Sequence, residues 1–300
     1  MKTQAPFHSK TPLTVIVIII ALLAVTAASA GIWSGGPGMM KKIILSVHGE
    51  VVELYGKGLY RNMSADVAIQ GIAQDYITLF LGVPLLLLSL TGFRKGWRWA
   101  DFLLAGTLGY FLVTYLFYLT MAMYNVLFLA YSALMGLSFF AFYMIIGLLR
   151  ADLTSGTHDS VRHIFRENTP VKFTGGFLMF NAVAISFLWL AVVVPPLLDG
   201  TIYPHELKHY TTLIVQGFDL GLLLPLSFIA GMLLWRKRPD GYLFGVIYTV
   251  FLSFLMTALS AKLIAMAVHH VDVIPAILII PAFNLVTIFC AVMMLKGIKR

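Results

Sequence analysis

The chain has 300 residues, of which 60% are hydrophobic and 11% are charged, and its mean hydropathy is +0.90. A soluble globule of this size needs more charge on its surface, so the composition excludes an ordinary soluble protein and indicates a membrane protein. The net charge of +8 arises mainly from short loops, where anionic lipid headgroups suffice as partners, and we expect no nucleic-acid partner.

Eight apolar stretches are long enough to cross a bilayer, because a membrane-spanning helix needs about 20 mostly apolar residues. They cover residues 12–33, 69–92, 99–121, 124–149, 173–195, 212–235, 242–267 and 273–295. The sequence therefore predicts an all-α fold, a polytopic membrane helix bundle that forms a single integral membrane domain over residues 1–300. The lipid bilayer is its expected partner, and no protein partner is indicated.

Basic residues alternate between the gaps that separate these stretches. Fifteen of the 21 lysines and arginines fall at the two termini and in the second, fourth and sixth gaps, around residues 93–98, 150–172 and 236–238. By the positive-inside rule, this distribution predicts that both termini are cytoplasmic. The short loops favour a bacterial inner membrane.

The first apolar stretch also fits a cleavable signal peptide, with Lys2 and Lys10 before the apolar run and Ala28-Ser29-Ala30 after it. Cleavage would leave seven spans. Because the apolar run continues to Trp33, which suits the membrane interface, we favour a retained helix. Residue 31 emerges on the outer side in either case.

Two segments lie outside the spans and are long enough to carry structure of their own. Residues 34–66 are expected to form a cap on the outer face, in which residues 43–55 fit either a hairpin that turns at His48-Gly49 or a short interfacial helix. Residues 150–172 are expected to form a cytoplasmic connector.

The second and sixth spans share an order of features that suggests an internal repeat. Each has an acidic residue (Asp75, Asp219), a proline (Pro84, Pro225) and then a basic cluster. This order favours a parallel four-plus-four duplication with halves 1–150 and 173–300. The alternative is that apolar spans with basic cytoplasmic ends resemble one another without duplication.

Three ionisable residues, Asp75, Asp219 and Lys262, lie inside predicted spans at comparable depths in the outer part of the bilayer. An ionised group near the bilayer centre costs on the order of 3 kcal/mol, so such residues usually face protein or water. With Gln74 and Gln216 beside the two acids, they predict an outward-facing polar vestibule. The leading functional hypothesis is transport or sensing of a small polar solute or ion, coupled to protons through an aspartate, without a cofactor.

Polar residues also recur at helical spacing in two spans. The first set is predicted to share one face of a helix that begins near Pro204, and the second is interpreted as hydrogen bonding between packed helices. The two sets are His205, His209, Thr212, Gln216 and Asp219, and Thr107, Tyr110, Thr114 and Tyr118.

The segment His205-Glu206-Leu207-Lys208-His209 resembles the zincin signature, in which two histidines one helical turn apart bind zinc and the glutamate acts as general base. This resemblance implies an alternative function, an outer-face zinc-dependent hydrolase with His205 and His209 as metal ligands and Glu206 as the catalytic residue. We favour the simpler interpretation, a helix start in which Pro204 occupies the first turn. A further alternative is a non-catalytic membrane helper subunit.

Over residues 58–84 and 216–241, the chain resembles a group of bacterial multi-pass membrane proteins of unassigned activity. That resemblance implies a membrane bundle and transfers no functional residue.

Overall fold

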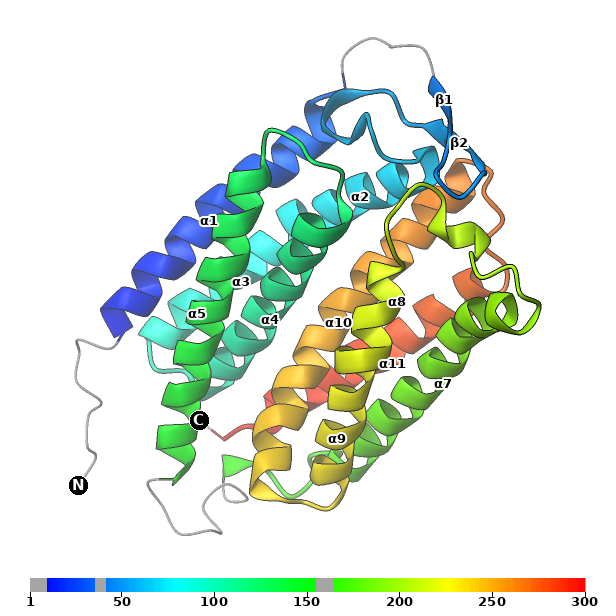
Figure 1. The fold of residues 1–300 in the computed structure, drawn as a ribbon. Helices are drawn as coiled ribbons and strands as arrows, with labels where there is room; N and C mark the ends of the chain where they lie inside the picture. Colours follow the sequence, from blue (N-terminus) through cyan, green and yellow to red (C-terminus); the bar gives the residue numbers. More distant parts are fainter. Residues whose placement is uncertain (1–9, 36–41, 155–163, 300) are drawn as a thin grey trace.

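The computed structural model describes residues 10–35, 42–154 and 164–299. Within these ranges, eight helical spans are long and apolar enough to cross a membrane, which confirms the predicted all-α polytopic bundle (Figure 1). Six of these spans are single helices: α1 (Lys10–Trp33), α4 (Arg98–Met121), α5 (Phe128–Thr154), α7 (Val171–Leu198), α10 (Pro239–Val268) and α11 (Ala276–Gly297).

The second and sixth spans each contain a π-helical segment between two α-helices. In the second span, η3 (Thr78–Gly82) separates α2 (Ala65–Ile77) from α3 (Val83–Arg94). In the sixth, η5 (Asp219–Leu223) separates α8 (Ile214–Phe218) from α9 (Leu224–Trp235). Each π-helical segment ends two residues before a proline, Pro84 or Pro225, whose missing N–H cannot complete a regular α-helical ladder. Short π-helical segments of this kind are frequent at functional sites.

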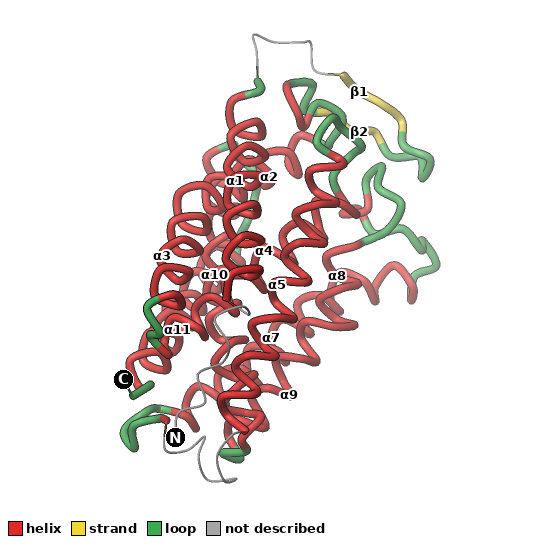
Figure 2. The backbone as a smooth tube through the Cα atoms, turned by 90° about the vertical axis from the view of Figure 1, so that its left-hand side faces the viewer, coloured by secondary structure: helices red, strands yellow, loops and turns green. Residues whose placement is uncertain are grey.

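The two ends of the bundle differ in structure. Helix α1 begins and α11 ends at one end, which we call the terminal end, and the strands lie at the opposite, hairpin end (Figures 1 and 2). Strand β1 (Lys42–Leu45) pairs antiparallel with β2 (Val51–Leu54), which confirms the hairpin alternative for this segment. The turn is closed by the Ser46 hydroxyl, which accepts hydrogen bonds from the backbone N–H groups of His48 and Glu50.

Helix α1 is an integral part of the bundle. It packs against α2, α3 and α5. Its buried side includes Leu13, Val17, Ile20 and Ala24, which are fully inaccessible. The first span therefore contributes to the core of the bundle.

Helices α4 and α10 form the centre of the bundle. In each, 72% of the most apolar stretch is buried inside the protein, compared with 22–44% for the other described spans. Their close approach depends on Gly106, because a methyl group there would overlap the Val250 side chain and lie 3.1 Å from the Ile247 carbonyl oxygen. These two helices therefore join the first four spans to the last four.

The turns that follow the second and sixth spans have the same hydrogen bonds. Corresponding residues, such as Trp97 and Arg238, are 141 positions apart. The N–H to C=O pairs are Lys95 to Thr91, Gly96 to Phe93, Trp97 to Gly92 and Ala100 to Trp97 in the first turn, and Arg236 to Met232, Lys237 to Leu234, Arg238 to Leu233 and Gly241 to Arg238 in the second. The two π-helical segments show the same 141-residue separation.

The predicted helix that begins near Pro204 and carries the polar stripe is wrong. Residues His205–Leu207 form one 3-10 turn (η4), Lys208 has a φ of 52°, and the helix begins only at Ile214. His205, His209 and Thr212 therefore do not share a helical face with Gln216 and Asp219. Contacts between this loop and the start of α2 outweigh its local helical pattern.

Two predicted segments fall partly outside the described residues. The residues outside are 36–41 of the predicted outer cap and 155–163 of the predicted cytoplasmic connector.

Candidate functional site

The three ionisable residues of the spans lie on different helices of the central region. Asp75 lies on α2, Asp219 is the first residue of η5, and Lys262 lies on α10. The Lys262 ammonium interacts electrostatically with Asp219 and with Asp75. Among the described residues, however, no carboxylate oxygen lies within 4.0 Å of Lys262. The three side chains therefore share one region without forming an ion-paired triad.

Asp75 is enclosed by phenol groups. The Tyr60 hydroxyl donates to Asp75 Oδ2 at 2.5 Å, and the Tyr118 hydroxyl lies 2.8 Å from Oδ1 and 3.0 Å from the Gly71 carbonyl oxygen. Helix α1 closes the remaining side, since a Cβ at Gly31 would overlap the carboxylate. Only 5% of Asp75 is exposed.

Tyr60 lies in η2 (Gly58–Tyr60), between the hairpin and α2. Burial, together with the nearby Asp75 carboxylate, raises the pKa of Tyr60 well above its usual value. Its phenol therefore keeps its proton and serves Asp75 as a donor.

Gln74 forms a second buried network next to Asp75. Its amide nitrogen donates to the Tyr110 hydroxyl at 2.7 Å and to Thr114 Oγ1 at 3.3 Å, and Tyr110 also bonds Thr78 at 2.9 Å. These contacts confirm that Tyr110 and Thr114 of the polar stripe on the third span join packed helices, whereas Thr107 bonds the Leu103 carbonyl oxygen of its own helix. Hydrogen bonds of this kind satisfy polar groups that lipid cannot solvate.

Asp219 faces a different neighbour. Its Oδ2 accepts a hydrogen bond from Trp189 Nε1 on α7 at 2.7 Å. Gln216, one turn earlier on α8, is partly exposed. Neither residue lines the cavity described next, and Asp219 shares no hydrogen-bond partner with Asp75.

A small cavity of about 90 Å³ lies near the hairpin end, between α2, α4, α8 and α10. Its polar lining residues are Gln70, Gln74, Thr114, Tyr118 and Lys262. The other lining residues are apolar or glycine, among them Met63, Phe117 and Leu255. Since a water molecule occupies about 30 Å³ of liquid, the space suits a few waters, a hydrated ion or a very small polar solute.

The cavity lies between corresponding segments of the two halves. Its lining includes three pairs of residues that are 141 positions apart: Gln74 with Val215, Thr114 with Leu255, and Met121 with Lys262. The cavity is therefore placed where matching positions of the first four and last four spans approach each other.

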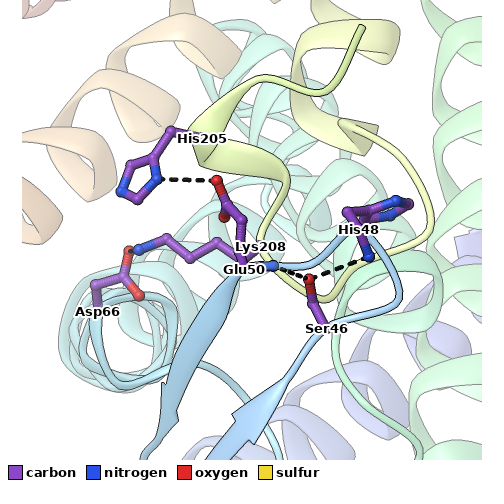
Figure 3. A network of polar contacts seen from close by, with 6 residues as sticks. All are labelled: Ser46, His48, Glu50, Asp66, His205 and Lys208. Atoms are coloured by element: carbon purple, nitrogen blue, oxygen red, sulfur yellow. Dashed lines mark hydrogen bonds and ion pairs between the residues drawn. The ribbon is translucent and has the colours of Figure 1, made fainter. Parts of the chain in front are cut away.

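No residue of the zincin-like segment lines this cavity. Figure 3 shows His205 and Lys208 of the segment beside the hairpin residue Glu50 and Asp66 at the start of α2. His205 Nδ1 lies 3.2 Å from Glu50 Oε1, and Lys208 Nζ lies 3.3 Å from Asp66 Oδ2. His209 Nε2 lies 3.1 Å from the Asn62 carbonyl oxygen. These contacts join the loop 199–213 to the hairpin and to the start of α2.

This segment does not form the helix that a zincin signature requires. The turn at Lys208 separates the two histidines, which contact different parts of the cap. Glu206 lies in the 3-10 turn and is exposed. Within the described ranges, no group of three or more histidine, cysteine, aspartate or glutamate side chains could hold a metal ion. His205 and His209 therefore do not lie one turn apart on a helix, as the zincin resemblance had implied.

Tyr210 in the same loop packs against the start of α2. Its hydroxyl accepts a hydrogen bond from the Ser64 backbone N–H at 3.3 Å and lies 3.4 Å from the Ser64 hydroxyl. Burial raises the pKa of Tyr210. This contact explains how a polar loop is held against the bundle without helical structure.

Sequence reasoning missed Tyr60, Trp189 and Gln70 as residues of the site, and it assigned Tyr118 only to packing. Tyr60 and Tyr118 bond Asp75 from 15 and 43 positions away along the chain, and Trp189 bonds Asp219 from 30 positions away. No local sequence pattern links residues over such separations. The spacing of Tyr118 from Thr114 was the one available signal.

The fold defines a polytopic α-helical membrane protein, and a small, mostly apolar cavity with five polar side chains lies between its first four and last four spans. Comparison with known proteins found no matching family, no matching curated protein and no matching solved structure.

Proposed function

We propose that this protein transports or senses a small polar solute or ion across the bacterial inner membrane, and that the cavity is its binding site. The observation that carries the proposal is the position of the cavity between corresponding segments of the two halves. Transporters built from repeated halves place their substrate sites at the interface of the repeats, near discontinuous helices.

The proposal includes an internal duplication of four plus four spans, with halves 1–150 and 173–300. The identical hydrogen bonding of two turns and the matched π-helical segments support it. At the α4–α10 contact, Gly106 approaches Ile247, its counterpart 141 positions later. In a two-fold arrangement, a residue on the axis contacts its own counterpart.

Lys262 gives the cavity its chemical preference. Among the described residues, its ammonium has no hydrogen-bond partner or ion pair, although it lines the cavity beside Gln70 and Gln74. The Lys262 ammonium and the Gln70 amide suit a solute that carries a carboxylate or another anionic group, whereas both N–H groups of Gln74 already donate to Tyr110 and Thr114. Asp75 and Asp219 lie within electrostatic range, and their negative charge reduces the cost of burying the ammonium.

The distribution of basic residues supports an orientation with both termini cytoplasmic. In that orientation the hairpin end faces the outer side, and the cavity lies in the outer half of the bundle. Solute would then enter from outside, past the cap.

Thermal unfolding of the purified protein with a panel of small carboxylates, inorganic anions and cations tests this function. A solute present at a concentration of 100 times its Kd stabilises the folded state by about 2.7 kcal/mol, so binding appears as a higher Tm. We expect at least one anionic solute to stabilise wild type and Ile264→Met, a lipid-facing control on α10, but not Lys262→Met. Equal stabilisation of Lys262→Met, or no stabilisation of wild type by any member of the panel, contradicts the proposal.

A further inference from the structure

We propose that Asp75 is a proton-exchange site behind the cavity, and that the Tyr118 hydroxyl carries the proton between Asp75 and the cavity. This inference rests on the proposed function, since it identifies the proton as an ion that the transport or sensing cycle uses. It is argued from the number of protons and acceptors around Asp75.

The two phenols that contact Asp75 have fewer protons to donate than there are acceptor atoms around them. Tyr60 has one proton, which it gives to Asp75 Oδ2 at 2.5 Å, and its oxygen also lies 3.2 Å from the Tyr118 oxygen. Tyr118 also has a single proton, but two acceptors lie at hydrogen-bond distance from its oxygen, Asp75 Oδ1 at 2.8 Å and the Gly71 carbonyl at 3.0 Å. Tyr118 can therefore donate to only one of them at a time.

The two choices correspond to the two protonation states of Asp75. When Asp75 is ionised, Tyr118 donates to Oδ1. When Asp75 carries a proton on Oδ1, the carboxylic acid donates to the Tyr118 oxygen, and Tyr118 donates to the Gly71 carbonyl. Conversion of the first arrangement into the second adds one proton to Asp75 Oδ1 and rotates the Tyr118 hydroxyl, and no heavy atom needs to move. Both states of the acid are thus satisfied by the same structure.

Tyr118 is also placed to connect Asp75 with the cavity. Asp75 is almost fully buried and is not part of the cavity lining, whereas Tyr118 both lines the cavity and bonds the carboxylate. Gly31 leaves no free space on the α1 side of the carboxylate. A proton that leaves Asp75 Oδ1 therefore meets the Tyr118 oxygen first.

The exchange step needs one water molecule in the cavity. The Tyr118 hydroxyl turns from Gly71 to that water, gives it a proton and takes the proton of Asp75 in return. The O–H bond of the Asp75 carboxylic acid breaks, a new O–H bond forms on Tyr118, and the water becomes hydronium. Carboxylic acid plus water thus become carboxylate plus hydronium, and the reverse step reloads Asp75.

The surroundings of Asp75 contain one charged group and several phenols. The titratable side chains that act on it are Tyr60 from η2, Tyr110, Tyr115 and Tyr118 from α4, Tyr131 from α5 and Lys262 from α10. Helix α1 faces it with Gly31, which has no side chain. Lys262, across the cavity, is positioned to stabilise the carboxylate that remains after the proton leaves.

Infrared difference spectroscopy of the full-length protein in liposomes, recorded over a pH titration without added solute, tests the proposal. We expect a carbonyl band of a protonated carboxylic acid that titrates in wild type and in the control Asp219→Asn. The band should be absent in Asp75→Asn. In Tyr118→Phe, which keeps the ring but removes the hydroxyl, the band should change its frequency and its titration midpoint.

The other acidic residues of the chain titrate in every variant, so the test concerns the one band assigned to Asp75. A band of the same frequency and midpoint that persists in Asp75→Asn overturns the proposal, as does a wild-type titration identical to that of Asp75→Asn while both proteins stay folded. An unchanged frequency and midpoint in Tyr118→Phe overturn the role of Tyr118. If Asp75→Asn fails to fold, Asp75→Glu replaces it, and an unshifted band in that variant counts against the site. Because no solute is present, a titrating Asp75 in a protein that binds no solute contradicts only the proposed function.

Discussion

The two acids of the spans, Asp75 and Asp219, occupy different environments. Asp75 is buried and contacts two phenol hydroxyls, whereas Asp219 is partly buried and contacts one indole N–H. A carboxylate inside a membrane protein needs donors, because lipid offers none. The mobile protons around Asp75 suit proton exchange, and the single fixed donor of Trp189 suits positioning of Asp219.

Replacement of Gly31 tests how tightly α1 closes the Asp75 site. In Gly31→Ala, the new Cβ overlaps the Asp75 carboxylate and lies 2.9 Å from the Tyr60 hydroxyl oxygen. We expect a loss of about 1–3 kcal/mol in stability, the usual cost of overpacking, measured as a lower Tm of the purified protein. Gly136→Ala on α5 is the control, since its Cβ meets nothing within 4 Å. Equal melting temperatures for the two variants would contradict the enclosure.

At the scale of helices, the two corresponding turns each contain a close contact between a glycine and a residue of the adjacent helix, but the glycine lies before the turn in one and after it in the other. In the first turn Gly92 on α3 faces Ala100 on α4, and in the second Gly241 on α10 faces Leu233 on α9. Both helix contacts need one residue without a side chain, which is the first of the two positions in one turn and the second in the other. The hydrogen bonding of the turn is therefore the same in both places although the residues differ, as the proposed duplication would require.

The central α4–α10 contact gives a paired prediction for two glycines one turn apart. Gly106→Ala places a methyl group on Val250 and beside the Ile247 carbonyl, so we expect a loss of about 1–3 kcal/mol in stability. Gly109→Ala meets its nearest neighbour, Phe142, at an ordinary 3.5 Å and should be neutral or more stable by up to about 1 kcal/mol. Thermal unfolding in detergent compares them, and a Gly109→Ala variant less stable than Gly106→Ala would show that the helices are not closest at Gly106.

At the scale of the molecule, the two halves contribute unequally to the cavity. The first half supplies Gln74 and Thr114, while the corresponding residues of the second are Val215 and Leu255. The reverse holds for the third pair, in which Lys262 faces Met121. A symmetric framework therefore surrounds an asymmetric site, with hydrogen-bonding groups on one side and a positive charge on the other.

Cysteine labelling of whole cells tests the orientation of the molecule. The single natural cysteine, Cys290, is buried, and it is replaced by serine in the background. We expect a membrane-impermeant maleimide to label Val47→Cys in the hairpin turn, where the side chain is 91% exposed, in intact cells. Arg236→Cys at the terminal end should react only after the membrane is permeabilised. The opposite pattern would place the termini outside.

The predicted spans agree with the helices to within a few residues, because the bilayer imposes a minimum length of apolar sequence that is read locally. The same holds for the hairpin alternative at residues 43–55 and for the polar stripe that ends in Tyr118. The helix expected at His205–His209 was wrong, because its spacing is a local pattern and the loop is held by distant partners such as Glu50 and Asp66.

The sequence by itself determined the fold class, the number of spans and the few ionisable residues that lie within them. Only the tertiary structure decided that Asp75 bonds Tyr60 and Tyr118, that Asp219 bonds Trp189, and that Lys262 faces a cavity. The physical reason is that apolar length and charge are properties of a segment. Partners depend instead on how each helix is rotated about its axis and on which helices pack together.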